Sequence, residues 1–170
     1  VTEVSITNEP DYLNTYESMN LTPSDLVNVI PVLRSRLNNS SFSSVDIISP
    51  EAARVSPGNS DKLTAVNSAI TYIQQMFQDS ATKSAVDVVA THTYYDSEHD
   101  ANWSDLRSVA DGKPVWVTES ANLKSLDFSM DDASDYIQWM TRGFNEGGMT
   151  AYLVHFCLLY TSDAADDLVG

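Results

Sequence analysis

The chain has 170 residues, 42% of them apolar and 19% charged, and its formal net charge is −15. This length is enough for one folded domain with its own core, and no apolar run reaches the roughly 18 residues that a membrane span needs. A surface this acidic repels phosphate backbones, so we expect neither nucleic acid nor a membrane as a partner. A single cysteine excludes an internal disulfide and a cysteine-based metal site.

The first predicted element is a strand over residues 3–8, where β-branched and polar residues alternate until the pattern stops at Asn8-Glu9-Pro10. A helix is predicted over 23–37. Thr22 is its expected N-cap, and a proline and an acid occupy its first turn. Pro31 is expected to kink this helix or to divide it into two pieces.

The middle of the chain repeats the alternation of strand and helix. A short apolar run predicts a strand over 45–53, and apolar residues at helical spacing predict a helix over 61–79. A third strand is expected over 85–96 and a fourth over 114–120, with a short helix or turn over 101–111 between them.

The last units are a helix that begins at Ser129 and ends before the glycine pair 147–148, and a fifth strand over 149–156. The stretch from Cys157 resembles one reading frame of a transposon end sequence used in preparing sequencing libraries. We therefore expect a partial domain over residues 1–156 and a non-native tail over 157–170.

Five apolar strands with intervening helices predict an α/β fold with a parallel sheet. An open doubly wound sheet and part of a (β/α)₈ barrel are the two candidate architectures. The sequence has no glycine-rich phosphate loop, and its polar residues follow the strands, as they do in barrel enzymes. These clusters are Asn8-Glu9, Ser49 to Glu51, His92 to Tyr94, and Glu119-Ser120. A whole barrel takes about 250 residues, so the chain is predicted to be its C-terminal five-eighths.

Two carboxylates stand at strand ends of this expected barrel. Glu9 ends the first strand and Glu119 ends the fourth, so both are expected at the same mouth. Paired carboxylates carry out glycoside hydrolysis, in which one protonates the leaving oxygen and the other attacks the anomeric carbon or activates water. Either glutamate by itself also fits a solvated strand end.

Two strings of the sequence resemble the acid/base and nucleophile strands of glycoside hydrolase clan A, and most closely family 30 in its xylanase-like branch. They are SITNEPDY, followed by YESM, and PVWVTES. The resemblance covers residues 1–156 and implies that the chain holds barrel strands 4 to 8. It implies Glu9 as general acid/base and Glu119 as nucleophile of a retaining enzyme.

The resemblance also implies substrate-binding residues. Asn8 is expected to hydrogen-bond the sugar 2-hydroxyl. His92 and Tyr94, in THTYY, resemble the clan's His-x-Tyr, whose tyrosine hydroxyl points toward the nucleophile. Tyr12 either stacks on a sugar ring or is an ordinary half-buried tyrosine. The three histidines form no zinc-binding motif, so we expect no metal and no other cofactor.

The implied activity is retaining hydrolysis of β-glycosidic bonds in a cell-wall polysaccharide, most readily of the xylan type, by a secreted, extracellular enzyme that is a monomer when complete. The fragment by itself is expected to be unstable and inactive. The alternatives are another clan A glycosidase (β-1,6-galactanase, β-1,6-glucanase or glucosylceramidase-like), a non-catalytic carbohydrate-binding barrel, and an open α/β domain.

Overall fold

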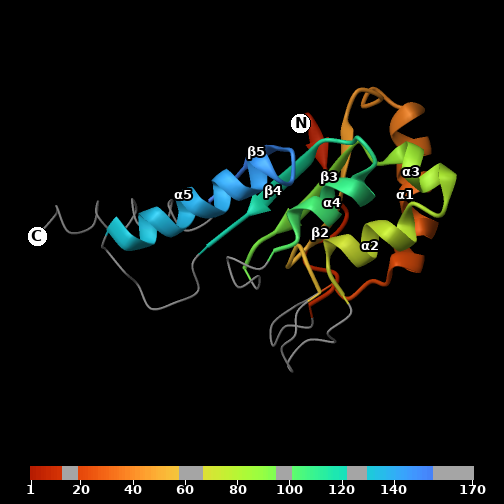
Figure 1. Cartoon of the computed structure of the whole chain (residues 1–170). Helices are drawn as coiled ribbons and strands as arrows, with labels where there is room; N and C mark the ends of the chain where they lie inside the picture. Colours follow the sequence, from red (N-terminus) through yellow and green to blue (C-terminus); the bar gives the residue numbers. More distant parts are fainter. Residues whose placement is uncertain (13–18, 58–66, 95–100, 122–129, 155–170) are drawn as a thin grey trace, which may run out of the picture.

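The computed structural model describes residues 1–12, 19–57, 67–94, 101–121 and 130–154 (Figure 1). Its strands form one parallel sheet in the order β1-β2-β3-β4-β5, so each strand lies beside the next one along the chain. The strands are β1 (Glu3–Val4), β2 (Asp46–Ala52), β3 (Val88–His92), β4 (Val115–Glu119) and β5 (Met149–Tyr152). The predicted parallel α/β fold is confirmed. The sequential strand order is that of a barrel wall and not of a doubly wound sheet, whose order reverses at a switch point.

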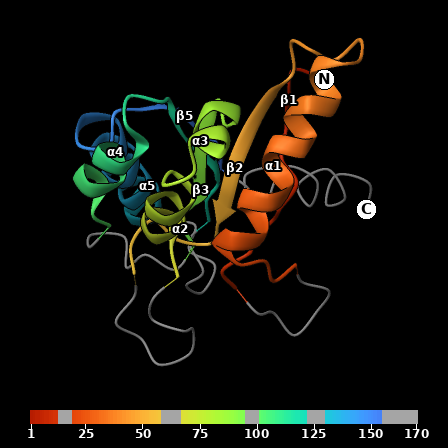
Figure 2. The same ribbon diagram turned by 90° about the vertical axis from the view of Figure 1, so that its right-hand side faces the viewer.

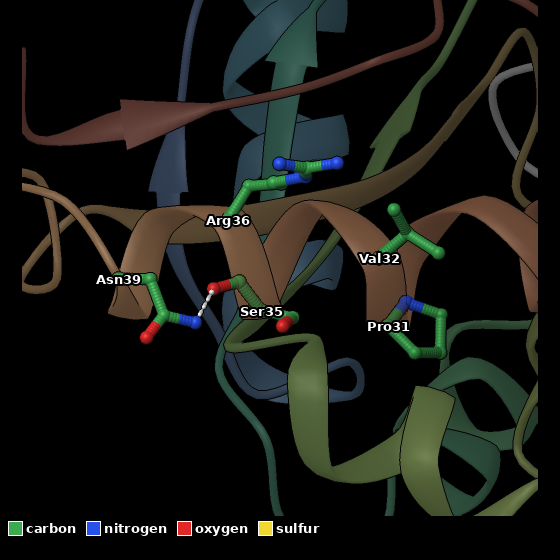
Figure 3. Close-up of a pocket in the computed structure, with 5 residues that line it drawn as sticks. All are labelled: Pro31, Val32, Ser35, Arg36 and Asn39. Carbon is green, nitrogen blue, oxygen red and sulfur yellow. Dashed lines mark hydrogen bonds between the residues drawn. The ribbon is translucent and has the colours of Figure 1, made fainter.

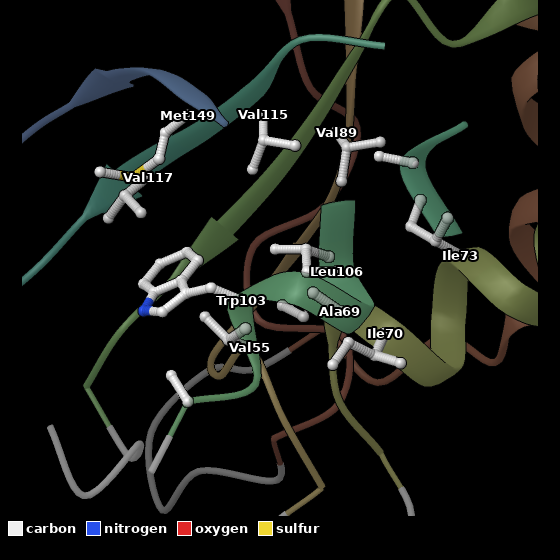
Figure 4. Close-up of a cluster of buried hydrophobic side chains, with 13 residues drawn as sticks. Val55, Ala69, Ile70, Ile73, Val89, Trp103, Leu106, Val115, Val117 and Met149 are labelled. Atoms are coloured by element: carbon white, nitrogen blue, oxygen red, sulfur yellow. The ribbon is translucent and has the colours of Figure 1, made fainter. Parts of the chain in front are cut away.

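The helices of the described residues are α1 (Pro23–Asn38), α2 (Ala69–Met76), α3 (Ser80–Ala85), α4 (Trp103–Ala110) and α5 (Met130–Asn145). One buried cluster joins α2 and α4 to the central strands, with Ile73 and Leu106 packed near Val89, Val115 and Val117 (Figure 4). A second buried cluster joins α1 to β2 and α2, and Figure 2 shows α1 beside β2. Alternate strand residues therefore face the helix layer, and the residues between them face away from it.

Helix α1 begins as the sequence predicts. Thr22 and Asp25 form a reciprocal capping box, and Pro23 is the first helical residue. Pro31 does not divide the helix, which is continuous from Pro23 to Asn38. A shallow groove on this helix, lined by Pro31, Val32, Ser35, Arg36 and Asn39, contains none of the predicted site residues (Figure 3).

The helix predicted over 61–79 is wrong as a single element. Ser68 has an extended backbone and caps α2, with its side chain accepting from Thr71 N, so the helix begins at Ala69. The part of the prediction over 61–66 lies outside the described residues. A serine is a good N-cap because its hydroxyl accepts from a backbone N–H that has no partner within the helix. This local hydrogen bond starts a helix at Ser68, although apolar residues continue at helical spacing on both sides of it.

Two predicted strands are shorter in the structure. The strand predicted over 85–96 begins only at Val88, because Asp79 caps the short helix α3, which holds residues 80–85. The strand predicted over 3–8 is β1, Glu3–Val4, and beyond it Thr7 Oγ1 donates to Pro50 O. Strand β5 ends at Tyr152, and the predicted tail over 157–170 lies outside the described residues.

The amino ends of the strands are tied by paired charges. Arg34 of α1 donates to Val45 O, at 3.0 Å, and to Ala85 O, and it forms an ion pair with Asp87. The same Asp87 carboxylate accepts from Ile47 N at 2.8 Å. One ion pair therefore joins a helix, the start of β2 and the residue that precedes β3.

Candidate active site

The carboxyl ends of β1 and β2 are joined by their backbones. The N–H of Glu9 donates to the carbonyl of Glu51 at 2.8 Å, and both residues have left-handed backbones, with φ of 46° and 60°. This conformation is uncommon for residues with a side chain and marks places where the chain is re-aimed. Glu9 and Glu51 are each less than a tenth exposed.

His92, the last residue of β3, is the centre of the cluster and is 1% exposed. Its Nδ1 lies 3.1 Å from Glu9 Oε1 and 3.7 Å from Glu119 Oε2. Its Nε2 lies 3.4 Å from Glu51 Oε2. Three carboxylates from three different strand ends thus surround a single imidazole.

Glu119 ends β4 and is the most exposed of the three carboxylates, with 30% of its side chain accessible against 10% for Glu9. The hydroxyl of Tyr94 donates to Glu119 Oε2 at 2.9 Å, and its ring stands edge-on to His92. The carbonyl of Glu119 accepts from Thr93 N at 3.2 Å. Glu119 is therefore a partly exposed, hydrogen-bonded carboxylate at the carboxyl end of the sheet.

The carboxylates of the cluster change the pKa values of His92 and Tyr94. Burial by itself lowers the pKa of His92, but the contacts with Glu51, Glu9 and Glu119 outweigh burial and raise that pKa to about 9. His92 is therefore a cation at neutral pH. Burial, the hydrogen bond to Glu119 and the negative charges of Glu119 and Glu9 raise the pKa of Tyr94, so its phenol stays protonated and remains a donor.

Asn8 and Tyr12, the other two predicted site residues, lie close to Glu9 in the chain. Asn8 precedes Glu9 in the chain and is exposed. Tyr12 is half-buried, and its backbone N–H donates to Glu9 O at 3.0 Å. The structure thus brings Glu9, His92, Tyr94 and Glu119 into contact, whereas the sugar-binding roles of Asn8 and Tyr12 stay predictions.

Three site residues were not singled out from the sequence. Glu51 stood only within a cluster of polar strand-end residues, and Thr118, which donates to Glu51 Oε2, had no distinguishing signal. Asp11 is 5% exposed, and its Oδ1 accepts from Ala53 N at 2.8 Å, which ties the segment after β1 to the end of β2. Burial raises the pKa of Asp11 to about 6.

Two further findings concern the described part of the chain. It contains no group of three or more histidine, cysteine, aspartate or glutamate side chains arranged to hold a metal ion. It also contains no helix that is both long enough and apolar enough to cross a membrane.

The model of a protein family described as "Glycosyl hydrolase catalytic core" matches residues 4–166. The chain belongs to this family. The match includes Glu9, His92, Tyr94 and Glu119, so the residues that the structure brings together lie within the glycosyl hydrolase core. No curated protein matches the chain.

Solved structures similar to this glycosyl hydrolase core include a glycoside hydrolase family 30 subfamily 8 xylanase from Clostridium acetobutylicum, with a TM-score of 0.66 and 21% identity. A family 30 endoxylanase from Clostridium papyrosolvens has a TM-score of 0.64 and 19% identity. SrfJ from Salmonella typhimurium has a TM-score of 0.68 and 18% identity. Each match covers 91% of this chain, but only 34%, 34% and 32% of the respective solved chains. The chain therefore has the fold of about a third of these structures.

Proposed function

We propose that the chain supplies the catalytic pair of a retaining glycosidase, with Glu119 as nucleophile and Glu9 as general acid/base. The observation that carries the proposal is that both carboxylates contact the same atom, His92 Nδ1, at 3.1 and 3.7 Å. The two contacting oxygens are thus no farther apart than the sum of these distances. Retaining glycosidases separate their carboxyl groups by about 5–5.5 Å and inverting ones by about 6.5–9.5 Å, so this upper limit admits the retaining spacing and leaves room only for the shortest inverting one.

The proposed reaction has two steps. The Glu119 carboxylate attacks the anomeric carbon and forms a glycosyl ester, while the bond to the leaving oxygen breaks and that oxygen takes a proton from Glu9. In the second step Glu9, now a carboxylate, takes a proton from water, and the oxygen of that water attacks the anomeric carbon and releases Glu119. The greater exposure of Glu119 and the hydrogen bond from Tyr94 support its role as the ionised nucleophile.

Trapping the glycosyl-enzyme tests this assignment. The full-length protein that contains this chain is incubated with a 2-deoxy-2-fluoro β-glycoside that carries a good leaving group. The fluorine slows both steps, whereas the reactive leaving group speeds only the first, so the glycosyl-enzyme accumulates. We expect peptide mass spectrometry to find the sugar on Glu119 and, in a separate reaction with an unfluorinated β-glycoside, ¹H NMR to show a β-anomer as the first product. A label on Glu9, or an α-anomer as first product, contradicts the assignment.

We infer that β1–β5 are strands 4 to 8 of an eight-stranded barrel. The helices cover one face of the sheet, whereas Trp116, which lies between the buried Val115 and Val117 and faces the other way, is only half-buried. All-parallel sheets normally have both faces covered, so this face fits a barrel interior completed by further strands. The 170-residue chain by itself is expected to melt without cooperativity and to hydrolyse no glycoside. A cooperative melt with full activity contradicts the inference.

For the substrate we propose a β-linked cell-wall polysaccharide of the xylan type, which two of the similar structures are named for. A polymer of this kind implies that the enzyme acts outside the cell. A panel of xylan, β-1,6-galactan, β-1,6-glucan and glucosylceramide, assayed at equal mass with the full-length protein, decides among them. Release of reducing ends from xylan at least tenfold faster than from the others is the expected result.

A further inference from the structure

Glu51 is a third carboxylate in the cluster, and the proposed reaction does not use it. It is 7% exposed, and its Oε2 accepts a hydrogen bond from Thr118 Oγ1 and lies 3.4 Å from His92 Nε2. A buried carboxylate is costly unless it is paired and hydrogen-bonded. Glu51 Oε2 has both a hydrogen-bond donor, Thr118, and a charged partner, His92. His92 is also the residue that lies between Glu9 and Glu119.

The backbone on both sides of β3 is irregular where this contact forms. The register of β2 against β3 passes from Pro50 to Ala52 and omits Glu51, and the register of β3 against β4 omits Thr118. Each omitted residue is the extra residue of a bulge, and bulges next to active sites re-aim side chains. The side chains of Glu51 and Thr118 thereby meet across β3, at the level of His92.

The position of Glu51 determines what Nδ1 of His92 can do. A carboxylate beside Nε2 favours a proton on that nitrogen, because which ring nitrogen is protonated depends on the bond that the other one makes. With Nε2 protonated, Nδ1 donates to the Glu9 carboxylate as part of an imidazolium. When that Nδ1 proton passes to Glu9, the imidazole becomes neutral and Nδ1 accepts from the Glu9 carboxylic acid. Retention needs Glu9 in both states in turn.

We propose that Glu51, held by Thr118, is a positioning residue that keeps the Nε2 proton on His92 and leaves Nδ1 to serve Glu9 in both protonation states. This rests on the proposed function of Glu9 and Glu119. The titratable groups that face His92 are Glu9 from the segment after β1, Glu51 from β2, Glu119 from β4, and Tyr94 from its own strand end. Three of them are acids, so removing the charge of Glu51 makes His92 titrate at lower pH.

The test compares Glu51→Gln with wild type in the full-length protein. The amide keeps the shape of the side chain, loses its charge and can donate to Nε2, which reverses the tautomer. We expect kcat for an aryl β-glycoside to fall roughly 10–100-fold with KM nearly unchanged. The alkaline limb of the pH–rate profile and the NMR titration of the His92 imidazole both move to lower pH. Glu146→Gln, which removes an exposed acid just after α5, is the matched control and leaves all three readouts at wild-type values.

A second pair of variants covers the case in which Glu51→Gln does not fold. Thr118→Val removes the hydroxyl that holds Glu51 while it keeps the branched shape, and we expect it to lower kcat about 3–10-fold. Thr118→Ser restores the hydroxyl and recovers activity. The proposal is overturned if a folded Glu51→Gln or Thr118→Val protein keeps the wild-type kcat, pH profile and His92 titration. Full activity of Glu9→Gln and Glu119→Gln would instead overturn the proposed function itself.

Discussion

The two ends of the parallel sheet differ in how their charged side chains are balanced. At the amino ends, Arg34 and Asp87 balance each other, and they also bond backbone groups of Val45, Ile47 and Ala85. At the carboxyl ends, Glu9, Glu51 and Glu119 crowd around His92, so acids outnumber the cation by three to one.

The difference shows which end of the molecule serves stability and which serves chemistry. The charges of Arg34 and Asp87 neutralise each other and are hydrogen-bonded within the protein, so a charged ligand would gain little by binding there. An excess of buried carboxylates is costly in the folded protein and is kept at places where protonation and charge must change during a reaction. We therefore expect substitutions at the two ends to have opposite effects on activity and on stability.

The largest expected effect is on activity at the carboxyl end. Replacing Glu119 with Gln removes the proposed nucleophile, so kcat of the full-length protein is expected to fall roughly 10⁴–10⁶-fold. The melting temperature changes little, because the loss of one of three crowded negative charges offsets the loss of one charged contact with His92. Steady-state kinetics and calorimetry on one preparation measure both effects. A fall in melting temperature that accompanied intact activity would contradict the comparison.

The second effect is a pH dependence of stability that arises from His92. Its pKa is raised from 6.5 to about 9 in the folded protein, so the folded state binds more protons than the unfolded state between these values. The resulting stabilisation is fully present below pH 6.5 and is lost as the pH rises through 9, and it amounts to on the order of 3 kcal/mol. Denaturant unfolding from pH 6 to 10 measures it. His92→Gln, which removes the titrating ring, should flatten the curve.

The third effect is on stability at the amino end. Asp87→Ala leaves Arg34 without its partner and removes the acceptor of Ile47 N, which is expected to cost about 2–3 kcal/mol of unfolding free energy. The kcat of the folded fraction stays within about twofold of wild type, since no group of the carboxylate cluster changes. A loss of kcat comparable to that of Glu119→Gln would show that the two ends are not independent.

The smallest effect is expected at an exposed pair on neither end. Arg142 in the last turn of α5 and Glu146, the residue after the helix, lie 3.1 Å apart, with 30% and 46% of their side chains accessible. Solvent and salt screen such pairs, so Glu146→Gln is expected to leave the unfolding free energy nearly unchanged. A chemical-denaturation midpoint that moves as far as that of Asp87→Ala would contradict the ranking.

The parts of the fold that were predicted depend on local signals. Thr22 and Pro23 predict the start of α1, and apolar runs predict the strands of the sheet. The errors arose where a local bond competed with periodicity. Ser68 caps α2 within a stretch that reads as one continuous helix, and Asp79 starts α3 where no helix was expected.

The sequence by itself determined that polar residues follow the strands, and that Glu9, His92, Tyr94 and Glu119 are among them. It could not determine that Glu51 belongs with them, because its place depends on bulges in β2 and β4 that bring Glu51 and Thr118 together across β3. Alternation assigns a side chain to a face of the sheet, and an extra residue in the strand changes that assignment. Only the tertiary structure decided which carboxylates share His92, because that contact joins residues up to 83 positions apart in the chain.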